Sequence, residues 1–584
     1  MAEPGAEAHY SVPKEADSLF RAGVLGNPLI AKNLPAGAVD ASRSIRFEGS
    51  DEPSLPVNWR FAESISALKA YEATVVNVLL QRKYGVERPA EIVINTDHAQ
   101  LFIMSALLWT IDPDDWDKHQ ANTPYRGAVT NIYKTKDDRY FHLHGSMNPG
   151  IMLEALGLPQ NQDLTKPEDS WPILQDTLSK YTAAEIQSLA LAHRQAGTIC
   201  WTIDEFKASE HGKANADVGL FEIEHHPDPN TNQPPGWWPS PTNNPQSSGI
   251  STHRPLAGLK VVDLARVIAG PAVSRGLAEL GASVMRITAP HLTDISVLHP
   301  DLNHGKWNAC LDLRTDEGRK ALRDLVMDAD VFLQGYRPGV LDKYGFGEQD
   351  VLEMGRKRGR GIVYCGENCY GWQGPWMERS GWQQISDACC GVSYEFGRAM
   401  GNDEPVTPVF PNSDYCTGVA GIVGIITALL RRAEEGGSYT VKIALNYYSQ
   451  WLVNSAGTYP HPSGPTSGSA TAPRVPAPPP DAAPPPADAG PGRPEQRQEA
   501  VPARVLHAVP RQVDRQRHTH RRARPPVPQR RGQARVRHRH AYEWGRPAGV
   551  AGRLGCGGGG ERWEGELESL GFGIEDRPKP GSPF

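Results

Sequence analysis

The sequence predicts an α/β protein built on a parallel sheet with helices on both faces. Two observations lead to this class. Between residues 256 and 458, short apolar runs of strand length alternate with segments of helical spacing, and such alternation is typical of βαβ units. The same stretch has mixed charge and enough apolar residues for a core, and segments rich in Pro and Gly flank it.

The first βαβ unit begins with the apolar run LKVVDLA at 259–265 and ends with ASVMRIT at 282–288. Between them a loop leads into a helical segment at 272–281 with apolar residues on one face. Pro271 is tolerated in the first turn of a helix, so free N–H groups are expected at the carboxyl edge of the first strand. Parallel sheets place nucleotide-like ligands at that edge. A purely structural turn is the alternative, because no G-x-G-x-x-G motif is present.

The alternation continues through the rest of this stretch. A helical segment, an apolar run, a Gly/Pro loop, a further apolar run and a long apolar helix follow at 318–329, 330–336, 337–347, 359–371 and 414–437. This order predicts more βαβ units in the same sheet.

Composition divides the chain into five parts. Residues 46–225 (the first region) and 256–458 (the second region) have globular composition. Residues 226–255 between them are rich in Pro, Asn and Ser and are expected to be a linker. Residues 1–45 are expected to be a loosely ordered leader, and residues 459–584 form a low-complexity Pro/Arg/Gly tail.

The tail has no apolar periodicity, so we expect it to be disordered or to be a frameshift product. Between 461 and 541 it lacks Asn, Met, Lys, Ile, Phe and Tyr while Arg, Pro, Ala and Gly are abundant. An out-of-frame reading of G/C-rich DNA gives this composition. The alternative is a genuine basic tail that binds nucleic acid or an acidic partner.

The composition of the whole chain excludes several classes. The 584 residues carry a formal charge of -6, which argues against a protein built around nucleic acid or an anionic membrane. No run of roughly 18 consecutive apolar residues is present, and the N-terminus lacks the order of a secretory signal. The 8 cysteines do not form a disulfide framework. We expect a cytoplasmic protein with reduced cysteines and no membrane association; mitochondria and peroxisomes are the alternative compartments.

Four blocks of the second region, in the same order, resemble the class III CoA-transferases, the CaiB/BaiF family. They are DLARVIAGPAVSRGLAELGASVMRI, NHGKWNACLDLRTDEGRKALRDLVMDADVFLQGYRPGVLDKYGFG, YGWQGPWMERSGW and SDYCTGVAGIVGIITALLRR. The resemblance implies a Rossmann-like domain with a smaller second domain and a homodimer. It also implies that the enzyme either moves CoA between carboxylic acids or racemises 2-methylacyl-CoA esters.

Asp414 matches the catalytic aspartate of this family. A carboxylate that attacks a thioester gives a mixed anhydride and releases thiolate, so CoA can move without ATP. Asp414 precedes the long apolar helix, whose positive end would favour the charged carboxylate. The structural alternative is an N-cap aspartate at the same position.

The resemblance also implies contacts with CoA. Arg266, Val267 and Ile268 match the loop after the first strand, Gln334, Gly335, Tyr336 and Arg337 match the V-E-N-F/Y-R-P-G block, and Lys343 occupies a usually basic position. Asn303 and Lys306 resemble a block that shapes the pocket. Gln334-Gly335 departs from the usual Glu-Asn pair. Basic residues on loops are also often simply solvated.

Two motifs weigh against other activities. Racemases of this family carry a proton-transferring histidine after the glycine in the third block, and here that place is Trp382. His142 and His144 alternate on one predicted strand as a metal pair could, but no third ligand follows. We therefore predict no metal site.

The first region repeats part of the second. VLLQRKYGVERPAEIVINTDHAQLF at 78–102 matches 428–452 at a constant offset of 350 (428 minus 78), which places Ser64 opposite Asp414. NIYKTKDDRYFHLHGSMNPGIMLEALGL resembles the strand pair and helix from the later part of a family unit. A glycine-rich loop from that later part closes the family's active site. Either GCGGGG at 555–560 or the first region is a candidate for that role.

The sequence therefore predicts a CoA-transferase that moves CoA from an acyl-CoA thioester to a carboxylic acid through an aspartyl mixed anhydride. No tightly bound cofactor is expected, and coenzyme A enters as a substrate. The alternatives are a catalytically inactive CoA-binding or scaffold protein, a nucleic-acid binder acting through the tail and, least favoured, a 2-methylacyl-CoA racemase.

Overall fold

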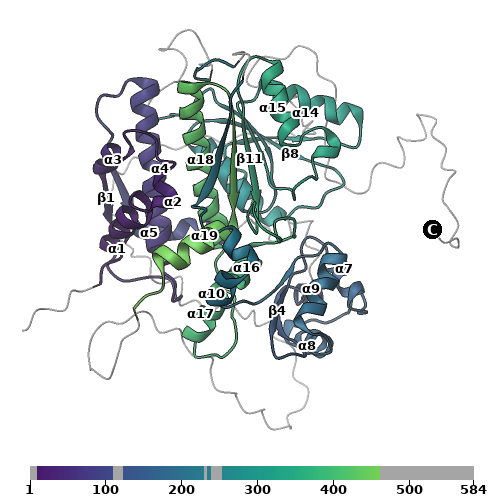
Figure 1. Cartoon of the computed structure of the whole chain (residues 1–584). Helices are drawn as coiled ribbons and strands as arrows, with labels where there is room; N and C mark the ends of the chain where they lie inside the picture. The colour runs from purple at the N-terminus through teal and green to yellow at the C-terminus, as the bar shows by residue number, and fades with distance from the viewer. Residues whose placement is uncertain (1–9, 110–122, 229–232, 239–252, 461–584) are drawn as a thin grey trace, which may run out of the picture. The chain divides into compact units, whose positions relative to one another are not determined.

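The computed structural model describes residues 10–109, 123–228, 233–238 and 253–460. These residues form an α/β structure with three sheets, of seven, three and two strands (Figure 1). The predicted fold class is confirmed. The predictions for the tail from residue 461 on, including the glycine run at 555–560, lie outside the described residues. Tyr459, at the predicted start of the tail, is buried, and its hydroxyl donates to Glu63 at 3.0 Å.

The seven-stranded sheet has the order β6-β12-β11-β10-β7-β8-β9. Every neighbouring pair from β12 to β9 is parallel, and β6 alone is antiparallel, to β12. The strands are β6 (Phe221–His226), β7 (Lys260–Leu264), β8 (Ser283–Thr288), β9 (Lys306–Cys310), β10 (Val331–Gln334), β11 (Val363–Asn368) and β12 (Ser438–Ala444).

Three strands of this sheet, β6, β9 and β12, were not predicted as apolar runs. β9 is an edge strand in which only Ala309 is buried and Trp307 and Asn308 are exposed, so it has no apolar run. β6 comes from the end of the first region and pairs with β12 along its length. The two regions that composition separates therefore share one sheet.

Helices cover both faces of the sheet. The bounds of those in the second region are α12 (Ala269–Glu279), α13 (His299–Leu302), α14 (Asp316–Asp328), α15 (Glu348–Lys357), α16 (Gln383–Cys389), α17 (Val392–Ala399), α18 (Asn412–Glu435) and α19 (Leu445–Trp451). α12 packs closely on α18 because both are rich in small residues. A Cβ atom on Gly418 of α18 would lie 2.7 Å from the Ala272 Cβ of α12, so a larger residue would force the helices apart.

α18 is a core helix. By length and composition it is the one described helix apolar enough to cross a bilayer, yet its whole apolar window is buried inside the protein. A helix that is apolar on every side is expected where other elements surround it.

The first region contains a second copy of the α18–β12–α19 unit. α4 (Phe61–Tyr84), β2 (Ile92–Asn95) and α5 (Thr96–Phe102) follow one another in the same order and at the register that the sequence repeat predicts. α4 packs beside α18, and the two helices contribute to one hydrophobic core (Figure 1). β1 (Ile45–Glu48) pairs with β2 in parallel and forms a separate two-stranded sheet.

The expectation of a loosely ordered leader is wrong for the described residues before 46. They form the helices α1 (Val12–Leu19), α2 (Pro28–Ala31) and α3 (Ala38–Ala41), with a helical turn at Phe20–Leu25. Val12, Ala16 and Phe20 are fully buried, because their i, i+4 spacing forms an apolar stripe on the side where α1 packs against α4. This apolar pattern spans few residues, so the amino-acid composition of the segment does not reveal it.

Part of the predicted linker is also packed. The Trp238 ring is buried, and its Nε1–H donates to the Ala257 carbonyl at 3.0 Å. The Lys83 ammonium at the end of α4 lies 3.8 Å from the centre of that ring. This aromatic residue therefore anchors the connection to both regions.

The rest of the first region builds a smaller antiparallel sheet with its own core. It contains the strand pair and the helix that the sequence resemblance predicts. The elements are α6 (Pro124–Gly127), β3 (Asn131–Lys134), β4 (Tyr140–Leu143), α7 (Pro149–Ala155), α8 (Trp171–Leu178), α9 (Ala183–Ala192), β5 (Gly197–Ile199), α10 (Ile203–Ala208) and α11 (Glu210–Ala214).

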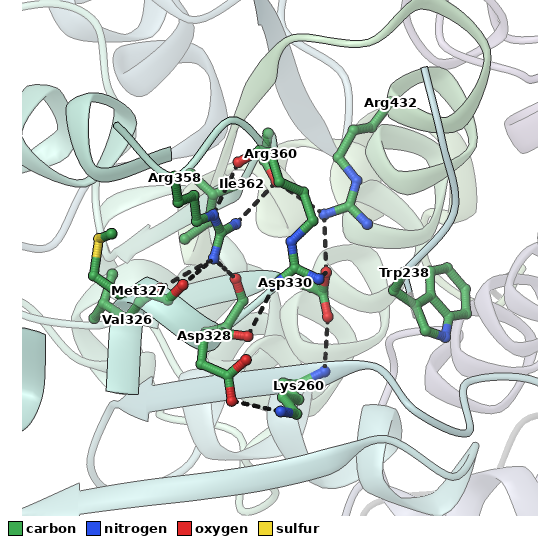
Figure 2. A network of polar contacts seen from close by, with 12 residues as sticks. Trp238, Lys260, Val326, Met327, Asp328, Asp330, Arg358, Arg360, Ile362 and Arg432 are labelled. Carbon is green, nitrogen blue, oxygen red and sulfur yellow. Dashed lines mark hydrogen bonds and ion pairs between the residues drawn. The ribbon is translucent and has the colours of Figure 1, made fainter. Parts of the chain in front are cut away.

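A buried polar network ties the amino ends of the central strands together (Figure 2). The Asp330 carboxylate, just before β10, lies 3.3 Å from the Arg432 guanidinium of α18 and 3.3 Å from that of Arg360. It also accepts the backbone N–H of Lys260 at the start of β7 at 3.2 Å. Arg358 donates to the carbonyl oxygens of Val326, Met327, Ala329 and Gly361. The network lies at the sheet edge opposite the carboxyl ends of the strands.

Candidate active site

Asp414 lies in the first turn of α18 and faces a cavity at the carboxyl edge of the sheet. Its side chain is not a cap: the N-cap residue is Pro411, and no side-chain capping hydrogen bond is made. Only 9% of the residue is exposed. Burial raises the pKa of the Asp414 carboxyl to about 7. The desolvation cost therefore outweighs the helix dipole, which we expected to favour the charged form.

Two further carboxyls accompany Asp414, and sequence reasoning missed both. Glu367 stands near the end of β11 and lines the same cavity, and Asp387 lies on α16. Burial, followed by the Asp414 charge, raises the pKa of Glu367 to about 8 and the pKa of Asp387 well above its usual value. Among the described residues no ion pair involves any of the three.

The cavity has a volume of about 500 Å³. It brings together eight of the nine residues predicted as the nucleophile or as CoA contacts, which lie far apart in the sequence. They are Arg266, Val267, Ile268, Gly335, Tyr336, Arg337, Lys343 and Asp414.

Gln334 is the exception. Its Oε1 accepts the backbone N–H of Tyr336 at 2.7 Å, and its side chain lies outside the main cavity, in a neighbouring one. Because side chains alternate along β10, Gln334 and Gly335 point to opposite faces of the sheet. Gln334 therefore shapes the loop that carries Tyr336.

The loop between β7 and α12 has a strained backbone at Val267. Its φ of 71° lies in the left-handed region, which β-branched residues rarely adopt. Such strain costs about 1–3 kcal/mol and is typical of functional loops. The loop holds Arg266, whose guanidinium lies 5.4 Å from the centre of the Tyr336 ring.

Cationic side chains without carboxylate partners line the cavity. Arg194, Arg337, Lys343 and Arg379 all face it, and none of them forms an ion pair with a described residue. Burial lowers the pKa of Arg337, and the nearby Arg194 guanidinium lowers it further. Like charges held together without a counter-ion favour an anionic ligand.

The first region supplies one wall of this cavity. The residues that it contributes are Ser146, Met147, Asn148, Ile151, Arg194 and Gln195. The hypothesis that this region helps to complete the site within one chain agrees with this placement. Sequence reasoning did not identify these residues individually, because only the folded chain brings them to the loop of β7.

Lys306 lies beneath the cavity rather than in its wall. Its ammonium is completely buried, 3.3 Å from the Asp263 carboxylate, and donates to the Pro271 carbonyl at 2.9 Å. Ser274 donates to the same carboxylate at 2.6 Å. These bonds join β7, β9 and the first turn of α12, so Lys306 supports the loop that carries Arg266. Asn303 does not line the cavity either.

His142 and His144 are structural. His144 Nδ1 accepts the Ser146 N–H at 2.9 Å, and its ring stacks on Trp382 with centroids 5.3 Å apart. Burial lowers the pKa of His142 to about 4 and that of His144 to about 3, so both are neutral. Trp382 lines the cavity.

Among the described residues, one group could hold a cation: Glu224, His226 and Glu348, at the β6–β12 edge. The Lys442 ammonium lies 3.6 Å from Glu348 and 4.0 Å from Glu224 and offsets part of their charge. Six cysteines, Cys200, Cys365, Cys369, Cys389, Cys390 and Cys416, are buried and carry free thiols.

Comparison with known proteins identifies the family. The family model for CoA-transferase family III matches residues 256–481. The chain is 53% identical over 476 residues to the acetyl-coenzyme A transferase nodX of Hypoxylon pulicicidum, covering 77% of this chain and 78% of that protein. It is 35% identical over 466 residues to an acyl-CoA transferase of Gibberella moniliformis, covering 76% and 79%. A human succinyl-CoA:glutarate CoA-transferase is 30% identical over 213 residues, covering 34% and 46%. The chain belongs to CoA-transferase family III.

Proposed function

We propose that this chain moves CoA from an acyl-CoA thioester to a carboxylic acid, with Asp414 as the nucleophile. One observation carries the proposal: a buried carboxyl without an ion-pair partner faces a cavity lined by unpaired cations. A carboxylate in a poorly hydrated site is a strong nucleophile once it is ionised. The cations match the phosphate groups of CoA.

The reaction needs four balanced steps. The Asp414 carboxylate attacks the thioester carbonyl, the C–S bond breaks, and an aspartyl mixed anhydride and CoA thiolate form. The thiolate attacks the aspartyl carbonyl and releases the first acid, leaving an aspartyl-CoA thioester. The acceptor carboxylate attacks this thioester to form a second anhydride and thiolate. The thiolate then attacks the new acyl carbonyl and frees Asp414. No step consumes a proton.

The cavity residues divide into two groups in this scheme. Arg266, Arg337 and Lys343 from the second region, together with Arg194 from the first, bind the phosphates of CoA. Trp382 and Met147 are among the apolar residues that line the cavity and bind the acyl group. A homodimer is part of the proposal, and light scattering on the purified chain tests it.

Label exchange tests the proposed reaction. The full chain is incubated with acetyl-CoA or succinyl-CoA and labelled acetate, succinate, glutarate or malate, and label in the acyl-CoA pool is measured. These donors and acids follow the names of relatives, among them a succinyl-CoA–L-malate CoA-transferase subunit of Chloroflexus aurantiacus. We expect Asp414→Asn to lower exchange by about 10³-fold or more while CoA still binds.

Borohydride trapping supplies the second readout. Reduction of the aspartyl-CoA thioester changes the mass of the peptide that contains Asp414, and the variant should show no such change. Exchange that persists in Asp414→Asn contradicts the nucleophile assignment. CoA binding without exchange by the wild-type chain on any of these pairs would instead favour the inactive CoA-binding protein.

A further inference from the structure

Glu367 is the second carboxyl in the wall of the active-site cavity. It lies near the carboxyl end of β11, and its side chain keeps limited exposure, toward the cavity. No hydrogen bond or ion pair to it is formed by any described residue. A buried carboxyl without a partner is expected to remain protonated, because the charged form would lose its hydration without compensation.

The neighbouring strand makes room for this carboxyl. β10 and β11 are parallel neighbours with Gln334 opposite Gly366, which places Gly335 beside Glu367. A Cβ atom on Gly335 would lie 2.9 Å from Glu367 Oε2. The Gly at 335 departs from the asparagine that the family resemblance leads one to expect. The space of that missing side chain holds the Glu367 carboxyl, so the polar group now comes from the next strand.

We propose that Glu367 is a second catalytic residue, which donates a hydrogen bond from its protonated carboxyl to the carbonyl oxygen under attack. This inference rests on the proposed function. When the Asp414 carboxylate attacks the thioester carbon, the C=O π electrons move onto oxygen, and the Glu367 O–H donates to that oxyanion. The oxyanion then collapses and the C–S bond breaks. Glu367 keeps its proton throughout, so the balance of the reaction is unchanged.

The surroundings of Glu367 are consistent with this protonation state. Asp414 of α18 acts on it, and Cys365 and Cys369 are its titratable neighbours on and after its own strand. Gly335, which follows β10, and Ile443 of β12 lie beside it, and Ala265 of the β7 loop lies against Gly335; all three are uncharged. The cations Arg266, Arg337 and Arg379 line the cavity without an ion pair to Glu367. Burial and the Asp414 charge keep the carboxyl protonated up to about pH 8.

A pH profile of kcat separates this role from a structural one. In the wild-type chain, kcat should rise as Asp414 ionises near pH 7 and fall as Glu367 loses its proton near pH 8. Glu367→Gln keeps a donor of similar shape that does not titrate. We expect this variant to retain kcat within about tenfold at pH 7 and to lose the alkaline decline.

Glu367→Leu has no donor and should lower kcat about 10²- to 10³-fold, with little change in the dissociation constant for CoA. Gly335→Ala should lower kcat by a smaller factor, because its methyl group displaces the carboxyl. Circular dichroism checks that each variant folds. The proposal is wrong if the alkaline decline persists in Glu367→Gln or if Glu367→Leu keeps wild-type kcat. Both outcomes differ from failure of the proposed function, in which the wild-type chain shows no exchange or Asp414→Asn remains active.

Discussion

At the scale of single residues, the active site contains buried carboxyls that lower the stability of the folded protein and serve catalysis. Asp414 needs to be ionised to attack a thioester, yet burial opposes its ionisation. The Asp414 charge also raises the pKa of the Glu367 and Asp387 carboxyls, so ionising more than one of the three groups costs additional free energy. Such destabilising placements are characteristic of catalytic groups rather than of structural ones.

Asp414→Asn should therefore stabilise the protein at alkaline pH. The folded-state pKa of Asp414 is raised to about 7, above its unfolded value, so the native state binds more protons than the unfolded state between about pH 4 and 7. The wild-type protein therefore becomes less stable as pH rises through that range. The Asp414→Asn variant does not, because asparagine does not titrate. We expect a gain of about 4 kcal/mol at pH 8 and none at pH 4, because the pKa rises from 3.8 to about 7 and each pKa unit corresponds to 1.36 kcal/mol.

Urea denaturation of the wild type and the variant at both pH values measures this difference. Asp324→Asn, on the exposed face of α14, is the matched control. Equal stability of Asp414→Asn and the wild type at pH 8 would contradict the raised pKa.

The sequence identified Asp414 because its chemistry and its surrounding motifs agree. It could not identify Glu367, because a single glutamate at a strand end has no spacing signal. The one available hint was the glycine at 335, which is informative only when the partner strand is known. The same limit applies to Arg194, whose neighbour Arg337 lies 143 positions away (337 minus 194).

At the scale of secondary-structure elements, most of the second region was predictable. The apolar runs and helical segments predicted around β7, α12, β8, α14, β10, β11 and α18 all coincide with observed elements. The failures have physical causes. β9 is a solvent-facing edge strand, and the leader helices have short apolar stripes. β6 joins its sheet through backbone hydrogen bonds to β12, which leave no trace in the sequence.

The contribution of the first region to the site can be measured through Arg194. This residue follows α9 with a φ of 54° and lines the cavity close to Arg337. If it binds a phosphate of CoA, Arg194→Ala should raise KM for acyl-CoA about tenfold, with kcat little changed. Added salt should reduce the difference.

Steady-state kinetics over a range of salt concentrations provide the measurement. Lys180→Ala, an exposed cation outside the cavity, is the control and should leave KM unchanged. An unchanged KM in Arg194→Ala would show that Arg194 of the first region does not bind a phosphate of CoA.

At the scale of the whole described chain, function and stability occupy opposite edges of the main sheet. The cavity lies at the carboxyl ends of the strands, whereas the Asp330 network joins their amino ends (Figure 2). Asp330 is completely buried and Arg432 is 2% exposed. Breaking such a pair leaves an uncompensated charge in the core.

Asp330→Ala should lower the free energy of unfolding by about 3–5 kcal/mol, because Arg432 and Arg360 lose their shared carboxylate. Thermal denaturation should show a lower Tm, whereas kcat and KM measured below the transition should match the wild type. Asp316→Ala, whose ion pair with Arg319 is exposed on its carboxylate side, should cost less than about 1 kcal/mol. A wild-type Tm in Asp330→Ala would show that the network is dispensable.

The antiparallel pairing of β6 with β12 determines how this chain can be divided. Composition suggests residues 226–255 as the place to divide the chain into two fragments. A fragment that starts after this linker would lack β6, so the N–H and C=O groups of β12 that face β6 would be unpaired. The same cut removes α4 from α18 and exposes apolar surface that the intact chain buries. The first and second regions are therefore parts of one folding unit and not independent domains connected by a linker.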